Sequence, residues 1–257
     1  MTALSAEPIV RSSLLSAVPG LVHGFTARDL GSMAGQVYSR EEQSRNRAAL
    51  EARIGLPLVK ASQVHSADVV LVERGTASRL RDGASEPASS LMRLEADALI
   101  TRERGVALAV AVADCAPILL ATPDGWLAAA HAGWEGATRR IVAALCDAIA
   151  ARGGKIADAR AAIGPAIGGC CYEIDAARAA TIRRRLGDTA SLIGPFVDGH
   201  LAFDIPAELV AQFGDAGVAR IDSLGLCTKD EVERFFSHRG EHGEAGRGFA
   251  FIGWSRA

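Results

Sequence analysis

The middle of the chain combines apolar runs that have no helical periodicity with clear turn signals. Gly105 to Asp114 is rich in valine and alanine without a helical stripe, which indicates a buried strand. Beyond Pro117, the run Ile118 to Thr122 predicts a second strand, and Pro123-Asp124-Gly125 is a strong turn signal. Trp126 to Ala132 returns as the partner, so the pattern predicts a β-hairpin.

Beyond the hairpin the apolar spacing changes to that of helices. Between Ile141 and Ile149 apolar residues recur at i, i+3, i+4, i+7 and i+8, which predicts an amphipathic helix ended by Gly153-Gly154. Two more helices are predicted, over Asp175 to Leu186 with a stop at Gly187, and over Lys229 to Phe236.

Strands and helices are mixed along the rest of the chain. Further strands are predicted over Val69–Glu73, Ala96–Thr101, Arg160–Ile163 and Val218–Ile221, and the polar segment Arg81–Ser90 is predicted to be an exposed loop. Hairpins occur where strict β-α-β alternation would not place them, so the pattern favours an α+β fold over a doubly wound nucleotide fold. No dinucleotide-binding or P-loop motif is present.

Composition and charge exclude several classes of protein. The 257 residues are 49% hydrophobic with a formal net charge of -2, so nothing in the bulk charge indicates a nucleic-acid partner. The N-terminus lacks a basic region followed by an apolar one, and the longest apolar run is broken by Asp114 and Pro117. We therefore expect a cytoplasmic protein without a membrane partner.

The five cysteines argue against a disulfide framework. Their number is odd and no C-x-x-C pair occurs, which also leaves zinc ribbons and thioredoxin-like sites unsupported. A cysteine with a role is therefore expected to be a metal ligand or a nucleophile.

The predicted hairpin brings two ligand-type residues to one end of a sheet. Cys115 directly follows the first buried run, and His131 ends the returning strand. His65 lies before another run of β-branched residues and could supply a third ligand, which would make a zinc site with one open position. The alternative stands beside it: a lone cysteine in an apolar strand is usually a small core residue, and a lone histidine is usually satisfied by a backbone hydrogen bond.

Phrases distributed over nearly the whole chain resemble the YfiH-like family. This family has long been called the laccase-domain or polyphenol oxidase family and is now described as purine nucleoside phosphorylases. The matching phrases, in family order, are HGFTAR (His23–Arg28), SQVHSADVV (Ser62–Val70), EADALIT (Glu95–Thr101), ADCAPILLAT (Ala113–Thr122), AAAHAGWEGA (Ala128–Ala137), IGPAIGGCCYEI (Ile163–Ile174), LCT (Leu226–Thr228) and FFSHRGEHGEAGRGFAFI (Phe235–Ile252).

The resemblance implies a fold and a set of site residues. We expect a single α+β domain over residues 1–257, with central mixed β-sheets in a sandwich flanked by helices in α/β/β/α layers. The family holds Zn²⁺ at the positions that correspond to His65, Cys115 and His131, and Arg28 is an expected active-site group. A guanidinium suits phosphate or another developing negative charge.

The resemblance also implies a reaction. It is phosphorolysis of adenosine, inosine, guanosine and methylthioadenosine, together with deamination of adenosine, so the expected partners are a purine nucleoside and phosphate. A catalytic zinc lowers the pKa of its bound water to about 7, which suits attack at C6 of adenine. Asp114, Glu173 and His238 are unranked candidates for the proton shuttle.

Two positions depart from the family pattern. Glu135 stands where a basic residue commonly follows H-A-G-W, which puts phosphate affinity in doubt. Ala27 removes a hydroxyl beside Arg28.

Three alternatives stay open. Cys115 could be the nucleophile of an amidase, with His65 or His131 as its base, that removes L-serine from a UDP-MurNAc conjugate during editing of peptidoglycan precursors. A copper-dependent polyphenol oxidase is poorer chemistry, because six histidines contain no His-x-His pair, although Cu²⁺ could occupy a His/Cys site.

The last alternative is a metal-stabilised scaffold without turnover, which would need a fourth protein ligand. Cys170 and Cys171 are adjacent and not expected to reach one ion together, and Cys146 is predicted to lie on the buried face of its helix. His238 and His242 are expected on an exposed loop. Nothing in the sequence decides the oligomeric state.

Overall fold

Two mixed β-sheets stacked face to face form the centre of the molecule. The computed structural model describes residues 7–87, 93–189, 191–195 and 199–256. The first sheet consists, in spatial order, of β1 (Ile9–Val10), β2 (Leu21–Thr26), β16 (Gly248–Trp254), β8 (Ala107–Val112) and β3 (Leu58–Val59). The second consists of β15 (Arg220–Ser223), β11 (Arg160–Ile163), β9 (Ala116–Ala121), β10 (Leu127–Ala132), β7 (Ala98–Thr101), β4 (Val69–Glu73), β5 (Thr76–Arg79) and β6 (Ser85–Pro87).

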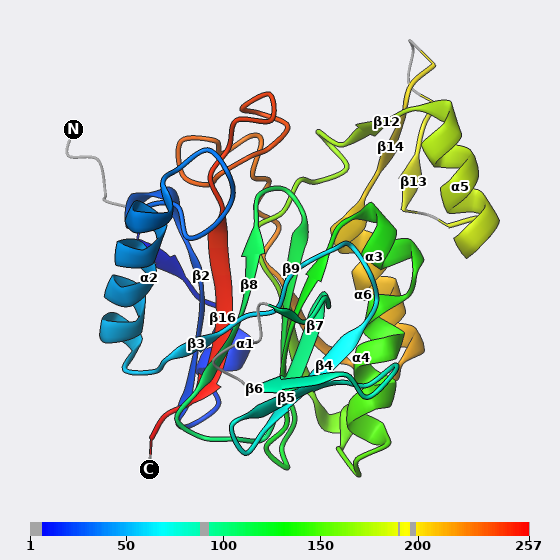
Figure 1. The fold of residues 1–257 in the computed structure, drawn as a ribbon. Helices are drawn as coiled ribbons and strands as arrows, with labels where there is room; N and C mark the ends of the chain where they lie inside the picture. The colour runs from blue at the N-terminus through cyan, green and yellow to red at the C-terminus, as the bar shows by residue number, and fades with distance from the viewer. Residues whose placement is uncertain (1–6, 88–92, 190, 196–198, 257) are drawn as a thin grey trace.

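Helices cover the outer faces of both sheets (Figure 1). The helices are α1 (Ser13–Ser16), α2 (Arg40–Ile54), α3 (Trp134–Thr138), α4 (Ile141–Ala150), α5 (Ala176–Leu186) and α6 (Ile205–Asp215). A small third sheet of β12 (Glu173–Ile174), β14 (Leu201–Phe203) and β13 (Leu192–Ile193) lies beside α5. With α2 outside the first sheet and α4 and α6 outside the second, the predicted α+β fold in α/β/β/α layers is confirmed. Among the described residues no helix is long and apolar enough to cross a membrane.

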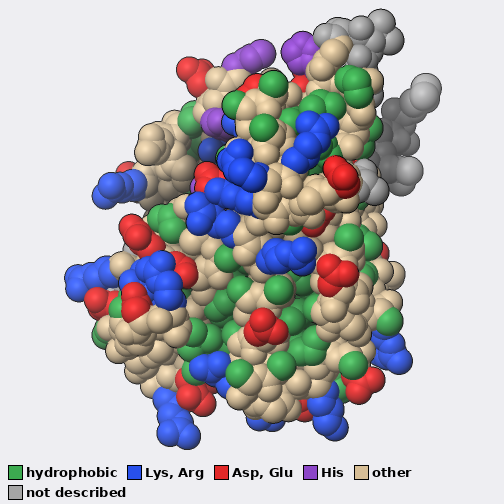
Figure 2. All heavy atoms as spheres, turned by 90° about the vertical axis from the view of Figure 1, so that its right-hand side faces the viewer, with side chains coloured by type: hydrophobic (Ala, Val, Ile, Leu, Met, Phe, Trp, Pro, Cys, Tyr) green, Lys and Arg blue, Asp and Glu red, His purple; other side chains and the backbone are tan. Residues whose placement is uncertain are grey.

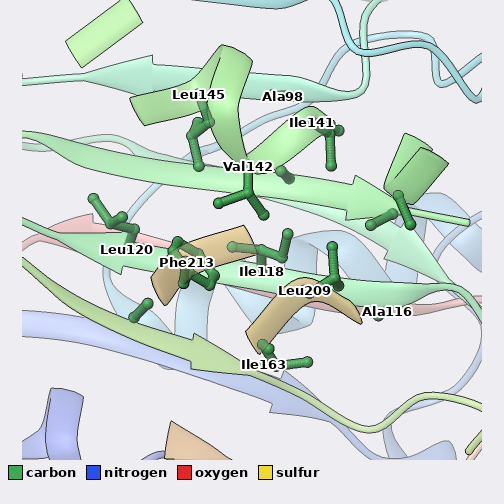
Figure 3. Close-up of a cluster of buried hydrophobic side chains, with 14 of the residues drawn as sticks. Ala98, Ala116, Ile118, Leu120, Ile141, Val142, Leu145, Ile163, Leu209 and Phe213 are labelled. Carbon is green, nitrogen blue, oxygen red and sulfur yellow. The ribbon is translucent and has the colours of Figure 1, made fainter. Parts of the chain in front are cut away.

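Each central strand is buried on both faces, which explains the apolar runs without alternation. In β9, Ile118 and Leu120 face the helices, where they belong to the same core as α4 and α6 (Figure 3), while Leu119 faces the other sheet. In β10 the helix-facing residues are the small Ala128 and Ala130. The core therefore consists of two layers of side chains, one on each face of the second sheet.

The chain crosses from one sheet to the other immediately before the predicted hairpin. Strand β8 ends at Val112 in the first sheet, and β9 begins at Ala116 in the second. The two strands are therefore separated at Ala113–Cys115 and not at Pro117. Pro117 lies within β9 and pairs with His131 in the hairpin. The hairpin is confirmed, with its first strand starting two residues earlier than predicted.

Most of the other predicted elements are present. Strands β4 and β11 match their predicted bounds, as do helices α4 and α5 to within one residue at each end. The predicted strand at Val218–Ile221 is displaced to β15. The segment Arg81–Ser90 is mostly exposed as predicted but contains the short strand β6, and its residues 88–90 lie outside the described residues.

The predicted helix over Lys229 to Phe236 is wrong. This segment forms a series of turns, and three of its carbonyl oxygens accept hydrogen bonds from Arg28. The Arg28 guanidinium donates to the carbonyl oxygens of Val232 at 3.0 Å and Phe235 at 3.2 Å. The backbone N–H of Arg28 donates to the carbonyl oxygen of Arg234 at 2.8 Å.

Four of the described helices, α1, α2, α3 and α6, were not predicted from the sequence. Helix α2 is mostly polar, so its sequence shows no apolar stripe. The sequence features that mark its two ends are Ser39, whose side chain accepts from the Glu42 N–H, and Gly55, which adopts a left-handed conformation. Helix α6 begins after Asp204, whose carboxylate caps the Ala207 N–H.

Candidate metal centre

Three side chains with metal-binding atoms meet at one end of the β9–β10 hairpin. The register pairs Ala116 with Ala132, so Cys115 and His131 return to the same end as predicted. His65 joins them, and the donor atoms of all three side chains lie within 4.8 Å of one another. Cys115 Sγ is 3.9 Å from His65 Nε2, and the two imidazole rings stand edge to face with centroids 4.9 Å apart.

Asp97, directly before β7, organises two of these three residues. Its fully buried carboxylate accepts hydrogen bonds from the backbone N–H groups of Val64 at 3.2 Å, His65 at 3.1 Å and Ser66 at 2.6 Å, and from the Ser66 hydroxyl at 2.8 Å. It also binds His131 Nδ1 at 2.9 Å. These bonds hold the His65 loop, in which His65 has a φ of +60°, and leave Nε2 of His131 as its ligand atom.

A carboxylate bound to the second nitrogen of a histidine is the usual support of a histidine ligand, since it fixes the tautomer and the ring orientation. The sequence analysis did not single out Asp97. The sequence feature that could have identified it is an aspartate directly before a strand that is buried at every position.

The three side chains form a gradient from the surface to the interior. His65 is exposed, Cys115 is half-buried and His131 is buried. Burial alone would raise the pKa of the Cys115 thiol, but the charge and hydrogen bonds of His131, together with those of His65, outweigh burial and lower it to about 6. Burial likewise lowers the pKa of His131, while Cys115 and Asp97 raise it to about 9. Between these values the metal-free protein holds a thiolate beside an imidazolium.

This ion pair predicts the alkylation behaviour of Cys115. In metal-free protein, the iodoacetamide reaction rate at Cys115 should rise through pH 6, whereas an ordinary thiol titrates near about 8.5. Zn²⁺ should protect the residue. Peptide mapping after timed alkylation measures both effects, and a rate that rises only above about pH 8 would contradict the ion pair.

The carboxylate of Asp114 points away from the three side chains, toward the segment before β16. One oxygen accepts from the hydroxyls of Thr228 and Ser237, both at 2.7 Å, and the other accepts from the Arg239 N–H at 2.6 Å. Asp114 has a φ of +79° and directly precedes Cys115. Its bonds therefore fix the backbone that carries the cysteine.

Arg28 is joined to the same segment. Besides its bonds to Val232 and Phe235, its guanidinium pairs with Glu241 at 2.7 Å, and Glu241 accepts from the Ser237 N–H at 2.9 Å. Arg28 thus lies at the far end of a polar chain that begins at Asp114. The structure joins Arg28 to Cys115 through this chain.

Comparison with known proteins identifies the family. Residues 24–255 match the family described as multi-copper polyphenol oxidoreductase laccase. The chain belongs to this laccase-domain, YfiH-like family. Within it, the chain is 34% identical over 255 residues to "Purine nucleoside phosphorylase YlmD" of Geobacillus stearothermophilus, which covers 91% of this chain and 90% of that protein. It is 33% identical to a purine nucleoside phosphorylase of Deinococcus radiodurans, over 97% and 94% of the two chains.

Solved structures of the laccase-domain family share the fold. The crystal structure of YlmD from Geobacillus stearothermophilus superposes with a TM-score of 0.83 at 29% identity, covering 98% of this chain and 97% of that one. The coverage on both sides means that the sandwich and the hairpin that carry His65, Cys115 and His131 belong to the shared architecture.

The other predicted shuttle candidates lie on the surface. Glu173 is exposed in β12, and its carbonyl oxygen accepts from the Arg239 guanidinium at 3.2 Å. His238 and His242 are exposed in turns, as predicted. Glu135 is in the first turn of α3 and pairs with Arg139 at 3.1 Å.

One expectation about the cysteines is wrong. Cys170 and Cys171, although adjacent, both point at one carboxylate, and together with Cys227 and Asp230 they form a second group of donor atoms within 4.8 Å of one another. A tight turn, in which the N–H groups of Cys171 and Tyr172 both donate to Gly168 at 3.0 Å, brings the two sulfurs to the same side. Cys146 is buried on α4, as predicted.

Proposed function

We propose that this protein is a zinc-dependent purine nucleoside phosphorylase that also deaminates adenosine. The observation that carries the proposal is the group of His65, Cys115 and His131 with its carboxylate support from Asp97, in a chain whose relatives are named purine nucleoside phosphorylases. The expected substrates are adenosine, inosine, guanosine and methylthioadenosine, with phosphate as the second substrate.

The donor set fits zinc. Two imidazole nitrogens and one thiolate are ligands that Zn²⁺ prefers, and the described residues place three donors in this group, so a fourth position stays open as in catalytic sites. His65, Cys115 and His131 would hold the ion, and the exposed His65 makes the group reachable from solvent. When bound there, the ion would supply Lewis-acid chemistry to a water, a phosphate or the nucleoside.

Basic and aromatic side chains beside Cys115 support a phosphate-binding role. Burial raises the pKa of Tyr172, and Arg178, Cys115, Arg239 and Asp114 are the charged groups near enough to act on it. Arg239 stacks over the Tyr172 ring at 5.2 Å. Figure 2, which views the right-hand side of Figure 1, shows Arg and Lys side chains gathered on the upper part of that face, next to histidines.

In phosphorolysis, a phosphate oxygen forms a bond to ribose C1′ as the bond from C1′ to the purine nitrogen breaks, and the purine leaves with the electron pair and takes up a proton. We assign Arg239 and Arg178 to holding the phosphate charge, since a guanidinium binds phosphate oxygens in pairs. Tyr172 and Trp134 offer flat apolar faces for the purine ring. Asp114 and Arg28 hold the backbone of Cys115 and the segment of Arg239 in place.

Incubating the zinc-loaded protein with adenosine, with and without phosphate, tests the proposal. Adenine and ribose 1-phosphate that appear only with phosphate establish phosphorolysis, and inosine that forms without phosphate establishes deamination. Absence of turnover for all four nucleosides by fully metallated protein would overturn the proposal.

The lowered pKa of Cys115 favours the amidase as a second candidate, because a thiolate beside an imidazolium is the resting state of many cysteine hydrolases. A chelator separates the two. A cysteine amidase should keep its release of L-serine from the UDP-MurNAc conjugate after metal removal, whereas a zinc enzyme should lose its activity until zinc is restored.

Arg239→Gln should raise the KM for phosphate about tenfold or more while the KM for adenosine changes little, because a hydrogen bond to a charged group contributes about 1.5–3 kcal/mol. The backbone N–H that holds Asp114 remains in this variant. Arg152→Gln is the matched control, since that guanidinium donates to the Ala148 carbonyl oxygen near the end of α4 at 2.9 Å. Equal KM values for wild type and variant would remove Arg239 from the phosphate site.

A further inference from the structure

A second group of metal-binding side chains lies outside the site described above. It consists of Cys170, Cys171, Cys227 and Asp230, whose donor atoms all lie within 4.8 Å of one another. We infer that these four residues bind a second metal ion, of the Zn²⁺ class, in a closed structural site. The inference is independent of which reaction the first site performs.

The geometry suits a tetrahedral ion. Cys171 Sγ lies 3.1 Å from one oxygen of Asp230, and Cys170 Sγ lies 3.3 Å from the other. Zinc bonds of about 2.3 Å to sulfur and about 2.0–2.2 Å to oxygen place these ligand atoms roughly 3.5–3.8 Å apart around a tetrahedron. Small shifts of these side chains are therefore enough to enclose an ion.

The donor types select the ion. Three thiolates are soft ligands that favour zinc over magnesium or calcium, which prefer oxygen. Four protein donors fill a tetrahedron and leave no open position, which distinguishes this group from His65, Cys115 and His131 and indicates a structural role. Cys170 and Cys227 also line a surface groove of about 360 Å³, so an ion has a path to the group.

The four ligands come in pairs from two loops that are distant in sequence. Cys170 and Cys171 lie between β11 and β12, and Cys227 and Asp230 lie between β15 and β16. The two loops already touch through Ala166, whose N–H and carbonyl oxygen both bind the second loop at 3.1 Å. A bound ion would crosslink them.

Both crosslinked loops hold Asp114. The Ile167 N–H donates to the Asp114 carbonyl oxygen at 2.8 Å, and the Thr228 hydroxyl donates to its carboxylate at 2.7 Å. Since Asp114 directly precedes Cys115, the second ion would stiffen the loops that position a ligand of the first.

Metal counting on purified full-length protein tests the inference. Zinc-loaded wild type, freed of loose metal by gel filtration, should carry two ions per chain by elemental analysis, one for each group. The double variant Cys170→Ser with Cys227→Ser should retain one, and so should Cys115→Ser. Cys146→Ala, which removes a buried thiol outside both groups, should retain two.

Cobalt substitution gives a second readout that does not depend on activity. Charge transfer from thiolate to Co²⁺ grows with the number of bound sulfurs, so the near-ultraviolet band should keep most of its strength in Cys115→Ser and fall sharply in the double variant, to the contribution of Cys115 at the first site. Asp230→Asn, an exposed substitution that spares the fold, should weaken Co²⁺ binding at least tenfold.

Two results would overturn the inference. One is a single ion in wild type that is lost entirely in Cys115→Ser. The other is Cys227 joined by a disulfide to Cys170 or Cys171 in native protein, found by alkylation and peptide mapping without reductant, which would make the group a redox pair instead of a metal site.

Discussion

Asp97→Ala should destabilise the protein by about 3–5 kcal/mol, the cost typical of removing one partner from a buried charge pair. Five donors lose their acceptor at once: the N–H groups of Val64, His65 and Ser66, the Ser66 hydroxyl and His131 Nδ1. Because this removes the support of two proposed ligands, metal affinity should fall as well, by 10- to 100-fold for loss of a second-shell partner alone. Urea unfolding and metal titration measure the two effects.

The pH dependence gives an independent check. Burial would raise the pKa of Asp97, but the bonds from His131 and Ser66 outweigh it and lower the pKa. The stabilisation is therefore complete above the pKa of an unfolded aspartate and is lost as the pH falls through the lowered value. Asp97→Asn should flatten this acid limb of the stability curve.

Asp68→Ala is the matched control, because Asp68 precedes the neighbouring strand β4 and its ion pair among the described residues is with Arg81, a largely exposed side chain, at 3.1 Å. Its loss should cost no more than about 1 kcal/mol. A similar decrease in the free energy of unfolding in the two variants would show that Asp97 contributes no more to stability than a carboxylate in a surface ion pair.

Cys115→Ser should abolish metal binding at the first site and all nucleoside turnover, while the free energy of unfolding of the metal-free protein changes by only about 1 kcal/mol. The thiol is half-buried at the end of the hairpin, so its replacement leaves no large cavity. Elemental analysis, product chromatography and urea unfolding provide the three measurements.

Cys115→Asp separates a ligand from a nucleophile. A carboxylate can still bind zinc, so a metal enzyme should keep part of its metal and a measurable rate, whereas a cysteine amidase should be inactive. Cys146→Ala serves as the control for loss of a thiol. Full nucleoside turnover in Cys115→Ser would contradict the proposed role of the residue.

The pattern of hydrophobic residues was sufficient to predict the elements that pack against the core. The hairpin and α4 were predicted because their apolar spacing is set by the two cores on either side of the second sheet. Helix α2 was missed because a polar helix on the outer surface carries almost no such pattern. The segment Lys229 to Phe236 forms turns instead of the predicted helix, and its carbonyl oxygens at Val232 and Phe235 accept from the Arg28 guanidinium, a tertiary contact that local spacing does not show.

The convergence of Cys115 with His131 followed from strand pairing, but other parts of the site did not. Asp97 acts through five hydrogen bonds, all to residues more than thirty positions away, and no local spacing encodes them. The group around Asp230 depends on a turn at Gly168 and on contact between two loops, so the adjacency of Cys170 and Cys171 was misleading.

The crossing at Ala113–Cys115 has a mechanical consequence. One end of this three-residue link continues β8 of the first sheet, and the other enters β9 of the second. Any sliding of one sheet over the other is thus transmitted directly to the Cys115 sulfur, while His131 moves with the second sheet alone. A change in how the two sheets pack would therefore alter the distance between Cys115 and His131, so the geometry of the candidate metal site depends on the packing of the sandwich.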